Sequence, residues 1–191
     1  ELVRLTVNTP DAARAVVAIR EKLDAAGIHV PLVGDFHYNG HKLLTEIPEC
    51  ADCLSKYRIN PGNVGKGTKA EENFAMMIEV AKRTGAAVRI GVNGGSLEKE
   101  LLAKYGHVTP EALVESALRH VRLLEKFDFT EICISVKSSD VPLNMAAYRL
   151  LHEKVDYPLH LGVTEAGTPT MGLLKSAIGI GGLLCEGIGD T

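Results

Sequence analysis

PLHLGVTEAG, at residues 158–167, is a short apolar run of leucine and valine that leads directly into a carboxylate and a glycine. In α/β proteins, a polar residue at the C-terminal end of a parallel strand lies where ligands bind. Glu165 is therefore the first candidate functional residue of the chain.

The same pattern of an apolar run that ends in polar residues recurs along the chain. The other runs are 2–8 (LVRLTVN), 30–39 (VPLVGDFHYN), 57–63 (YRINPGN), 88–93 (VRIGVN) and 131–137 (EICISVK). Patterns typical of helices separate them, at about 10–26, 41–54, 69–84, 110–127, 143–154 and 171–184. A strand is expected in each run, the last one at 159–163, and strands that alternate with helices predict a parallel sheet with right-handed crossovers.

Two α/β architectures have this order of elements: a doubly wound open sheet and a (β/α)8 TIM-type barrel. An open parallel sheet buries both faces under apolar helices, whereas several of these runs carry charged residues in their interior. The barrel is therefore favoured. A complete barrel needs eight units and about 250 residues. For 191 residues we expect a partial TIM-barrel substrate-binding domain, with about six βα units and without the first and last strands.

The composition narrows the class of protein and of ligand. With 46% hydrophobic and 24% charged residues, the chain can bury one sizeable core. No run approaches the ~20 apolar residues of a membrane span, and a cytoplasmic protein is expected, or a stromal one in a plastid-bearing organism. A net charge of −3 provides no general attraction for nucleic acid or anionic lipid. An anionic ligand must then be held by cations clustered locally.

The four cysteines are too few and too scattered for a disulfide scaffold. Cys50 and Cys53 form a CxxC pair, but no second pair supplies the four ligands of a structural zinc site. Cys133, within a strand, and Cys185, in the last helical run, are expected to be small core residues. No metal site is predicted from these residues.

Strand side chains alternate between the two faces of a sheet, and this places the basic residues on one face. Val3, Leu5 and Val7 on the opposite face of the first strand are apolar and suit a helix layer. The polar face should then point into the barrel. It carries Arg4, Thr6 and Asn8 on the first strand, Arg58 and Asn60 on the third, Arg89, Gly91 and Asn93 on the fourth, and Ser135 and Lys137 on the fifth.

Unpaired cations in a narrow lumen cost several kcal/mol each, so an anionic partner is expected. Three arginines and one lysine against Asp35 and Glu165 leave an excess of two positive charges, which a doubly charged phosphorylated ligand would balance. Backbone amides of the glycine-rich runs 60–67 (NPGNVGKG) and 93–96 (NGGS) are possible further donors. The alternative is a purely structural ion network.

Acid–base candidates come from the same strand ends. Asp35 and His37 lie two apart and so share a face. His160, in the middle of a predicted strand, is either a hydrogen-bond donor in the lumen or a satisfied core residue. The remaining histidines receive no role.

The motifs VRLTVN, VPLVGDFHYN, RINPGN, VRIGVNGGSLE, ALVESALRH, SVKSSD, PLHLGVTEAG and KSAIGIGGLLCEGIGDT resemble, in order, those of the 4-hydroxy-3-methylbut-2-enyl diphosphate synthase (GcpE) family. The resemblance implies a (β/α)8 barrel followed by a smaller domain that carries a [4Fe-4S] cluster. It also implies an iron–sulfur oxidoreductase of non-mevalonate (MEP) isoprenoid biosynthesis. The reaction would be reductive conversion of 2-C-methyl-D-erythritol 2,4-cyclodiphosphate to 4-hydroxy-3-methylbut-2-enyl diphosphate.

The resemblance also implies roles for individual residues. Arg4, Arg58, Arg89 and Lys137 would hold the diphosphate, Asn60, Asn93 and His37 would assist, and Glu165, Lys137 and Asp35 are the candidate catalytic residues. The cluster ligands would lie outside this chain, so the 191 residues alone are expected to be inactive. The intact protein is expected to be a homodimer that takes electrons from flavodoxin or ferredoxin.

Two other readings of the strand-end residues remain open. One is a phosphosugar lyase or aldolase in which Lys137 forms a Schiff base with a carbonyl substrate. The other is a phosphate-binding barrel without catalytic activity.

Overall fold

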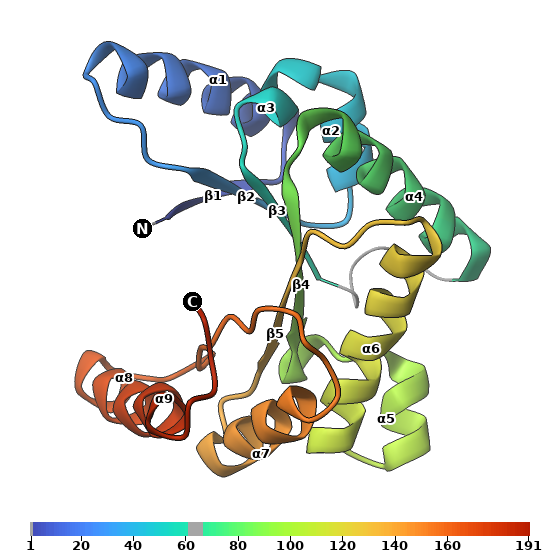
Figure 1. Cartoon of the computed structure of the whole chain (residues 1–191), viewed down its shortest axis with the longest axis vertical. Helices are drawn as coiled ribbons and strands as arrows, with labels where there is room; N and C mark the ends of the chain where they lie inside the picture. The colour runs from blue at the N-terminus through green and yellow to red at the C-terminus, as the bar shows by residue number, and fades with distance from the viewer. Residues whose placement is uncertain (1, 61–66) are drawn as a thin grey trace. The chain divides into compact units, whose positions relative to one another are not determined.

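The computed structural model describes residues 2–60 and 67–191 and contains a five-stranded parallel sheet (Figure 1). In the described part of the chain its strands follow one another in the order β1-β2-β3-β4-β5. A doubly wound sheet reverses its strand order at a switch point, and this order never reverses. The predicted barrel-type α/β fold is therefore confirmed. The strands are β1 (Val3–Val7), β2 (Leu32–Phe36), β3 (Lys56–Ile59), β4 (Ala87–Asn93) and β5 (Ile132–Lys137).

Helices follow the strands, and their starts show the expected capping chemistry. The Thr9 side chain accepts a hydrogen bond from the Ala12 N–H at the start of the first helix, and Thr109 does the same for Ala112. Across the described ranges, the helices are α1 (Pro10–Ala25), α2 (Gly40–Glu46), α3 (Pro48–Asp52), α4 (Gly67–Thr84), α5 (Lys99–Tyr105), α6 (Pro110–Lys126), α7 (Val141–His152), α8 (Pro169–Ser176) and α9 (Gly182–Cys185), with a π-helical turn η3 (Ala177–Gly181) between the last two.

The chain divides into two compact units, and the first contains Glu1–Arg89 and Leu123–Glu131. In this unit β1 pairs with β2 and β2 with β3, all in parallel. The helix α1 packs on β1 and against α3, which also contacts α2 and α4. Every residue of β2 is buried, with Leu32 at 1% exposure, so this strand lies at the centre of the unit's core.

The second unit contains Ile90–Arg122 and Ile132–Thr191. In this unit α7 packs on β5 and against η3 and α9 (Figure 1). Gly179, within η3, leaves room for neighbouring side chains, because a Cβ there would lie 2.9 Å from Cγ2 of Val163 and 3.4 Å from Cγ1 of Val141 in α7. The core of the unit includes Ile134 of β5 and Tyr148 of α7, both fully buried.

The predicted sixth strand at 159–163 is wrong in extent, because the described structure has only a single parallel bridge, between Ile134 and Leu159. The His160 N–H donates to the Ile134 carbonyl at 2.8 Å, but the Thr164 N–H reaches the Ser138 carbonyl only at 3.4 Å. The segment therefore starts as a parallel neighbour of β5 at Leu159, and its hydrogen bonds to the chain of β5 and the residues after it become longer toward Thr164. Gly162, in the middle, has no side chain to favour an extended backbone.

The expected helical run at 41–54 is two helices, α2 and α3, broken at Ile47. Pro48 lacks an N–H and disfavours helical geometry in the residue before it, and Ile47 accordingly has φ −129° and ψ 72°. After β4 the chain forms the 3₁₀ turn η2 (Gly94–Ser96), and Glu98 occupies the cap position of α5. Leu97, between this turn and the helix, is buried with 6% exposure.

The cysteines are all free thiols in the structure. Cys133 is buried in β5 as expected, whereas Cys185 is exposed, so the prediction that it is a core residue is wrong. The physical reason is its place at the end of α9, next to Leu184, which is itself 55% exposed. Among the described residues, no helix is both long and apolar enough to cross a membrane.

A half-buried histidine, His120, is expected to make the stability of the second unit depend on pH. Burial is the largest cause that lowers the pKa of His120 below the usual 6.5, Arg119 lowers it further, and the Ser116 carbonyl and Glu98 partly oppose the shift. The unfolded chain then binds more protons than the folded one just below pH 6.5, so stability is complete above that pH and falls as the pH decreases toward the lowered pKa.

We therefore expect thermal unfolding of His120→Gln to change less between pH 7 and pH 5.5 than unfolding of the unsubstituted protein. The exposed His29 provides the control, and His29→Gln should keep the original slope. Equal slopes for all three proteins would contradict the assignment of the pH dependence to His120.

Candidate functional site

A carboxylate at the end of β2 organises the charged side chains of the first unit. Asp35 accepts a hydrogen bond from the Arg58 Nη1–H, with 2.9 Å between Oδ1 and Nη1. Arg4 Nη1 lies 3.7 Å from Asp35 Oδ2, and His37 Nε2 lies 3.6 Å from Oδ1. The strand register explains the meeting, because Asp35 is the register partner of Arg58 on β3 and of Thr6 on β1. We call these four residues, Arg4, Asp35, His37 and Arg58, the Asp35 cluster.

The Asp35 cluster combines a buried ion pair with accessible donors. The side chains of Arg58 and Asp35 are only 7% and 8% exposed, whereas those of Arg4 and His37 are 55% and 38% exposed. Two guanidinium groups face one carboxylate, so the cluster keeps a positive charge even with His37 neutral. A partly buried positive group with exposed arginine and imidazole nitrogens is suited to bind an anion.

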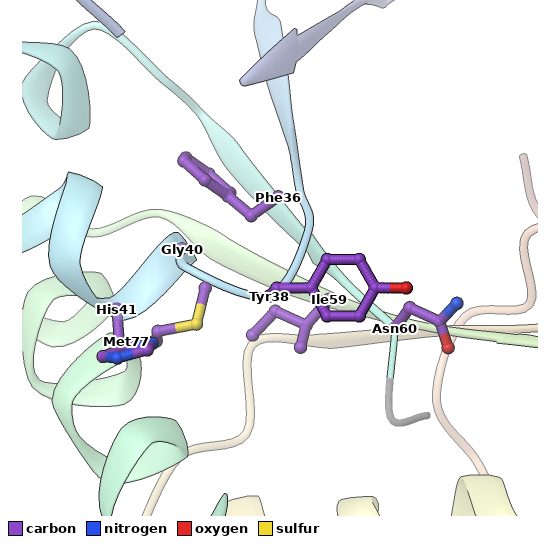
Figure 2. Close-up of a pocket in the computed structure, with 7 residues that line it drawn as sticks. All are labelled: Phe36, Tyr38, Gly40, His41, Ile59, Asn60 and Met77. Carbon is purple, nitrogen blue, oxygen red and sulfur yellow. The ribbon is translucent and has the colours of Figure 1, made fainter. Parts of the chain in front are cut away.

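Asn60 follows β3 and lines a small pocket beside the end of β2. Figure 2 shows Tyr38, Ile59 and Asn60 toward one end of this pocket, and His41 with Met77 toward the other. Burial is the largest cause that lowers the pKa of His41, which favours its neutral imidazole. Phe36 and Gly40 complete the lining.

Arg89 is the most deeply buried of the predicted cations, with 3% exposure in β4. Arg89 is the last residue of the first segment of the first unit. The run 61–66, expected to supply backbone donors, lies outside the described residues.

The ends of β4, β5 and the segment after Leu159 supply the polar residues of the second unit. Lys137 is the last residue of β5, and its side chain occupies the space above Gly162. A Cβ on Gly162 would lie 2.7 Å from Cε and 2.9 Å from Nζ of this lysine. Sequence reasoning missed the role of Gly162, although a glycine within a strand-like run is a signal for close approach of another group.

Glu165 lies against the loop that follows β4. Its Oε1 is 3.2 Å from the position that a Cβ on Gly95 would take, so the absence of a side chain at Gly95 makes room for the carboxylate. The backbone of Glu165 has φ 50°, in the left-handed region that residues other than glycine rarely adopt. Such strain persists only where the surroundings enforce it, and it concentrates at functional sites. Tyr38 and Asp128 have the same left-handed backbone, with φ 46° and 54°, so Glu165 stays a candidate on its φ together with its contact at Gly95.

The structure brings together some of the predicted site residues and leaves others apart within each unit. Asp35 pairs with Arg58 and Arg4, and His37 lies beside them. Pairing of this kind was also expected under the alternative of a purely structural ion network. His160 is a partly exposed residue whose Nδ1 lies 2.8 Å from the Thr191 hydroxyl. Asn93, at the end of β4, is half-buried.

The cysteines do not form a metal or cluster site. Cys50 is buried, and burial raises the pKa of its thiol to about 12, which disfavours the thiolate that binds metals. Within the part of the chain that the structure describes, no group of three or more His, Cys, Asp or Glu side chains is placed to hold a metal ion. These residues therefore do not fit an iron–sulfur cluster.

Comparisons with known proteins agree with this architecture. The whole chain, residues 1–191, matches the model of the GcpE TIM-barrel domain. It is 52% identical over all of its 191 residues to the 4-hydroxy-3-methylbut-2-en-1-yl diphosphate synthase (flavodoxin) of Caldanaerobacter subterraneus subsp. tengcongensis, and it spans 50% of that protein. A solved structure of 5-methylcytosine deaminase from Klebsiella pneumoniae is similar at a TM-score of 0.35 and 15% identity. That match covers 81% of this chain and 55% of the deaminase.

The last similarity is too weak to support an inference. The match to the GcpE domain covers every residue, and the identity to the synthase is high along the same length. The chain spans about half the length of the curated relative that it matches. This chain belongs to the GcpE TIM-barrel domain family.

Proposed function

We propose that the chain is the substrate-binding barrel domain of a 4-hydroxy-3-methylbut-2-en-1-yl diphosphate synthase. The observation that carries the proposal is the Asp35 cluster, in which two arginines share one carboxylate and leave a positive charge. This arrangement lies in a chain that matches the GcpE domain from end to end. A small diphosphate is the kind of ligand that such a cluster neutralises.

The proposed reaction opens the cyclic diphosphate and removes a hydroxyl group. The substrate, 2-C-methyl-D-erythritol 2,4-cyclodiphosphate, takes up two electrons and two protons. A carbon–oxygen bond to phosphate breaks, one hydroxyl leaves as water, and a carbon–carbon double bond forms. Charge that develops on the released phosphate is stabilised by fixed cations, and departure of the hydroxyl is assisted by a proton donor.

We assign the residues of the first unit to binding. Arg4, Arg58 and Arg89 are the proposed cations for the diphosphate, and guanidinium groups match phosphate oxygens in pairs. Asn60 and His37 supply further hydrogen bonds, and Asp35 keeps Arg58 in place and lies beside the reacting groups.

We assign the residues of the second unit to binding and chemistry. Lys137 contributes an ammonium group to the diphosphate, and Asn93 an amide. Glu165, held in a strained backbone conformation, is the proposed proton donor or positioning group near the reacting carbons. Glu186, 40% exposed and paired with Arg149, serves as a comparison for these roles.

The proposed reaction takes its electrons from a separate carrier protein. The relative's name includes flavodoxin, and a flavodoxin, or a ferredoxin, is the proposed donor. A [4Fe-4S] cluster in the intact protein would supply one-electron chemistry, with ligands that lie outside this chain. The intact protein is proposed to act as a homodimer in the bacterial cytoplasm or the plastid stroma, and the 191 residues alone to be inactive.

Anaerobic turnover tests the proposal directly. We expect the full-length protein that carries this domain to form the linear allylic diphosphate when it is given the cyclodiphosphate and a strong reductant. Phosphorus NMR measures the product. If the substrate returns unchanged from a cluster-loaded protein, the proposed function is wrong. Borohydride trapping at Lys137 with a keto-phosphate would then test the lyase alternative.

Gly162→Ala should displace Lys137 without unfolding the protein. The added Cβ would meet the flexible end of the lysine side chain, at 2.7 Å from Cε and 2.9 Å from Nζ, and this end can move at little cost. We expect a nearly unchanged melting temperature and a KM for the cyclodiphosphate at least several-fold higher, because the ammonium group no longer sits at the diphosphate.

A matched control is Gly181→Ala, since nothing lies within 4 Å of a Cβ at Gly181. It should leave the KM unchanged. An unchanged KM for Gly162→Ala as well would remove Lys137 from the proposed set of binding residues.

A further inference from the structure

The motif ALVESALRH, residues 112–120, has no part in the proposed chemistry, yet it places one buried and one half-buried polar side chain in the second unit. Ser116 is fully buried, and its hydroxyl lies 2.9 and 2.8 Å from the two carboxylate oxygens of Glu98, to which it donates. His120, one helical turn later on α6, has its Nδ1 3.0 Å from the Ser116 carbonyl. These three residues form one connected group, which we call the Glu98 network.

Glu98 is the N-cap residue of α5, and α5 lies beside α6 (Figure 1). Its backbone carbonyl accepts hydrogen bonds from the N–H groups of Leu101 and Leu102, both at 3.0 Å. Its side chain reaches Ser116, which lies 18 residues further along the chain. Glu98 therefore fastens the start of α5 through its backbone and fastens the same point to α6 through its side chain.

The loop that Glu98 fixes is the one against which Glu165 lies. Gly95 is three residues before Glu98, and Glu165 Oε1 is 3.2 Å from the position of a Cβ on Gly95. For the neighbouring Gly94, the corresponding distance to the Lys137 carbonyl is 3.7 Å. A shift of this loop would therefore move the surface on which the Glu165 carboxylate rests.

We propose that Glu98, Ser116 and His120 are positioning residues that hold the loop 93–98 in the arrangement Glu165 requires. The expected effect on turnover rests on the proposed function, whereas the expected effect on the structure of the loop 93–98 does not.

The chemistry of each group suits this role. An ionised carboxylate only accepts hydrogen bonds, so its donors determine its position. The single hydroxyl proton of Ser116 is shared between the two oxygens of Glu98, at 2.9 and 2.8 Å, and this fixes the carboxylate. Burial lowers the pKa of His120, which favours a neutral ring that adds no charge to compete for Glu98.

Ser116→Ala tests the positioning role in the full-length protein. We expect kcat with the cyclodiphosphate to fall at least tenfold, with the KM changed less than threefold. The loss should largely disappear when Ser116→Ala is combined with Glu165→Gln, because the network acts through Glu165. A merely structural role would lower kcat by the same factor in both backgrounds, and this outcome would overturn the proposal.

Glu115→Gln is the matched control. Glu115 is next to Ser116 on the same helix and also joins α6 to α5, through Lys104 Nζ at 2.6 Å, but at the last turn of α5 and away from the loop. This variant should lower the melting temperature while kcat stays unchanged.

Hydrogen exchange at the amides of residues 93–98 gives a readout without turnover. Exchange should be at least tenfold faster in Ser116→Ala and faster also in Glu98→Gln, and unchanged in Glu115→Gln. If the unsubstituted protein does not convert the cyclodiphosphate, the proposed function fails, and exchange alone decides the positioning role. Equal exchange in Ser116→Ala and the unsubstituted protein would overturn the inference in either case.

Discussion

Replacing Arg58 with alanine in the full-length protein is expected to weaken binding of the cyclodiphosphate by about 10- to 100-fold. Hydrogen bonds to charged groups contribute about 1.5–3 kcal/mol, and each 1.4 kcal/mol is about a factor of ten in affinity. Arg58 is buried at the end of β3, 2.9 Å from Asp35, so solvent screens its interactions little. Isothermal titration with the cyclodiphosphate, in the absence of reductant, measures the loss.

The same substitution should also destabilise the first unit. It leaves Asp35, 8% exposed, with Arg4 at 3.7 Å as its remaining arginine partner. Removing one partner of a buried pair costs roughly 3 kcal/mol or more, and chemical denaturation should detect it. Arg58→Lys keeps the charge but not the planar fork, so it should restore most of the stability and only part of the affinity.

Arg83 provides the matched control for Arg58. It belongs to the same unit and pairs with Asp52 at 2.7 Å, but both side chains are about half exposed, at 49% and 54%. Exposed pairs contribute about 0–1 kcal/mol, so Arg83→Ala should change neither affinity nor stability much. Arg58→Ala with unchanged affinity would make the Asp35 cluster a structural ion network, which is the alternative that the strand pattern left open.

The positions of the first five strands were predictable because the signal is local. Each run, such as VRIGVN before Gly94, contains its own alternation and its own terminating residues. The sixth strand failed because a strand forms only with a partner at hydrogen-bond distance. Just after 159–163 the bond from Thr164 N to the Ser138 carbonyl is already 3.4 Å, and within the segment Gly162 was the one local signal against a regular strand.

For the candidate site, the sequence predicted the face of the sheet on which a residue lies, but not its contacts. Alternation placed Arg4 and Arg58 on the polar face and Asp35 on one face with His37, but the pairing of Asp35 with the arginines depends on the register between strands. The close approach of Glu165 to Gly95 and the bond from Ser116 to Glu98 join residues distant in sequence. Such contacts depend on how the elements pack, so they appear only in the folded structure.

Glu165→Gln is expected to lower turnover of the cyclodiphosphate at least 100-fold while binding stays within threefold of the original. Loss of a general acid or base typically costs 10²- to 10⁴-fold in rate. Glutamine keeps the shape, so the contact with Gly95 and the loop after β4 should persist. A fall in kcat with little change in KM is the signature of an interaction that matters in the transition state more than in the ground state. Single-turnover kinetics under anaerobic conditions, with dissociation constants from titration, measure both quantities.

The backbone of Glu165 strengthens this expectation, because its φ of 50° makes the position costly for any residue with a side chain. A glycine would relieve the strain, so Glu165→Gly should raise the melting temperature or leave it unchanged while it removes activity. That combination separates a functional carboxylate from a structural one, because removal of a structural carboxylate would lower both the melting temperature and the activity. Glu186→Gln, at the exposed pair with Arg149, should keep full turnover, whereas full activity in Glu165→Gln would exclude Glu165 from the chemistry.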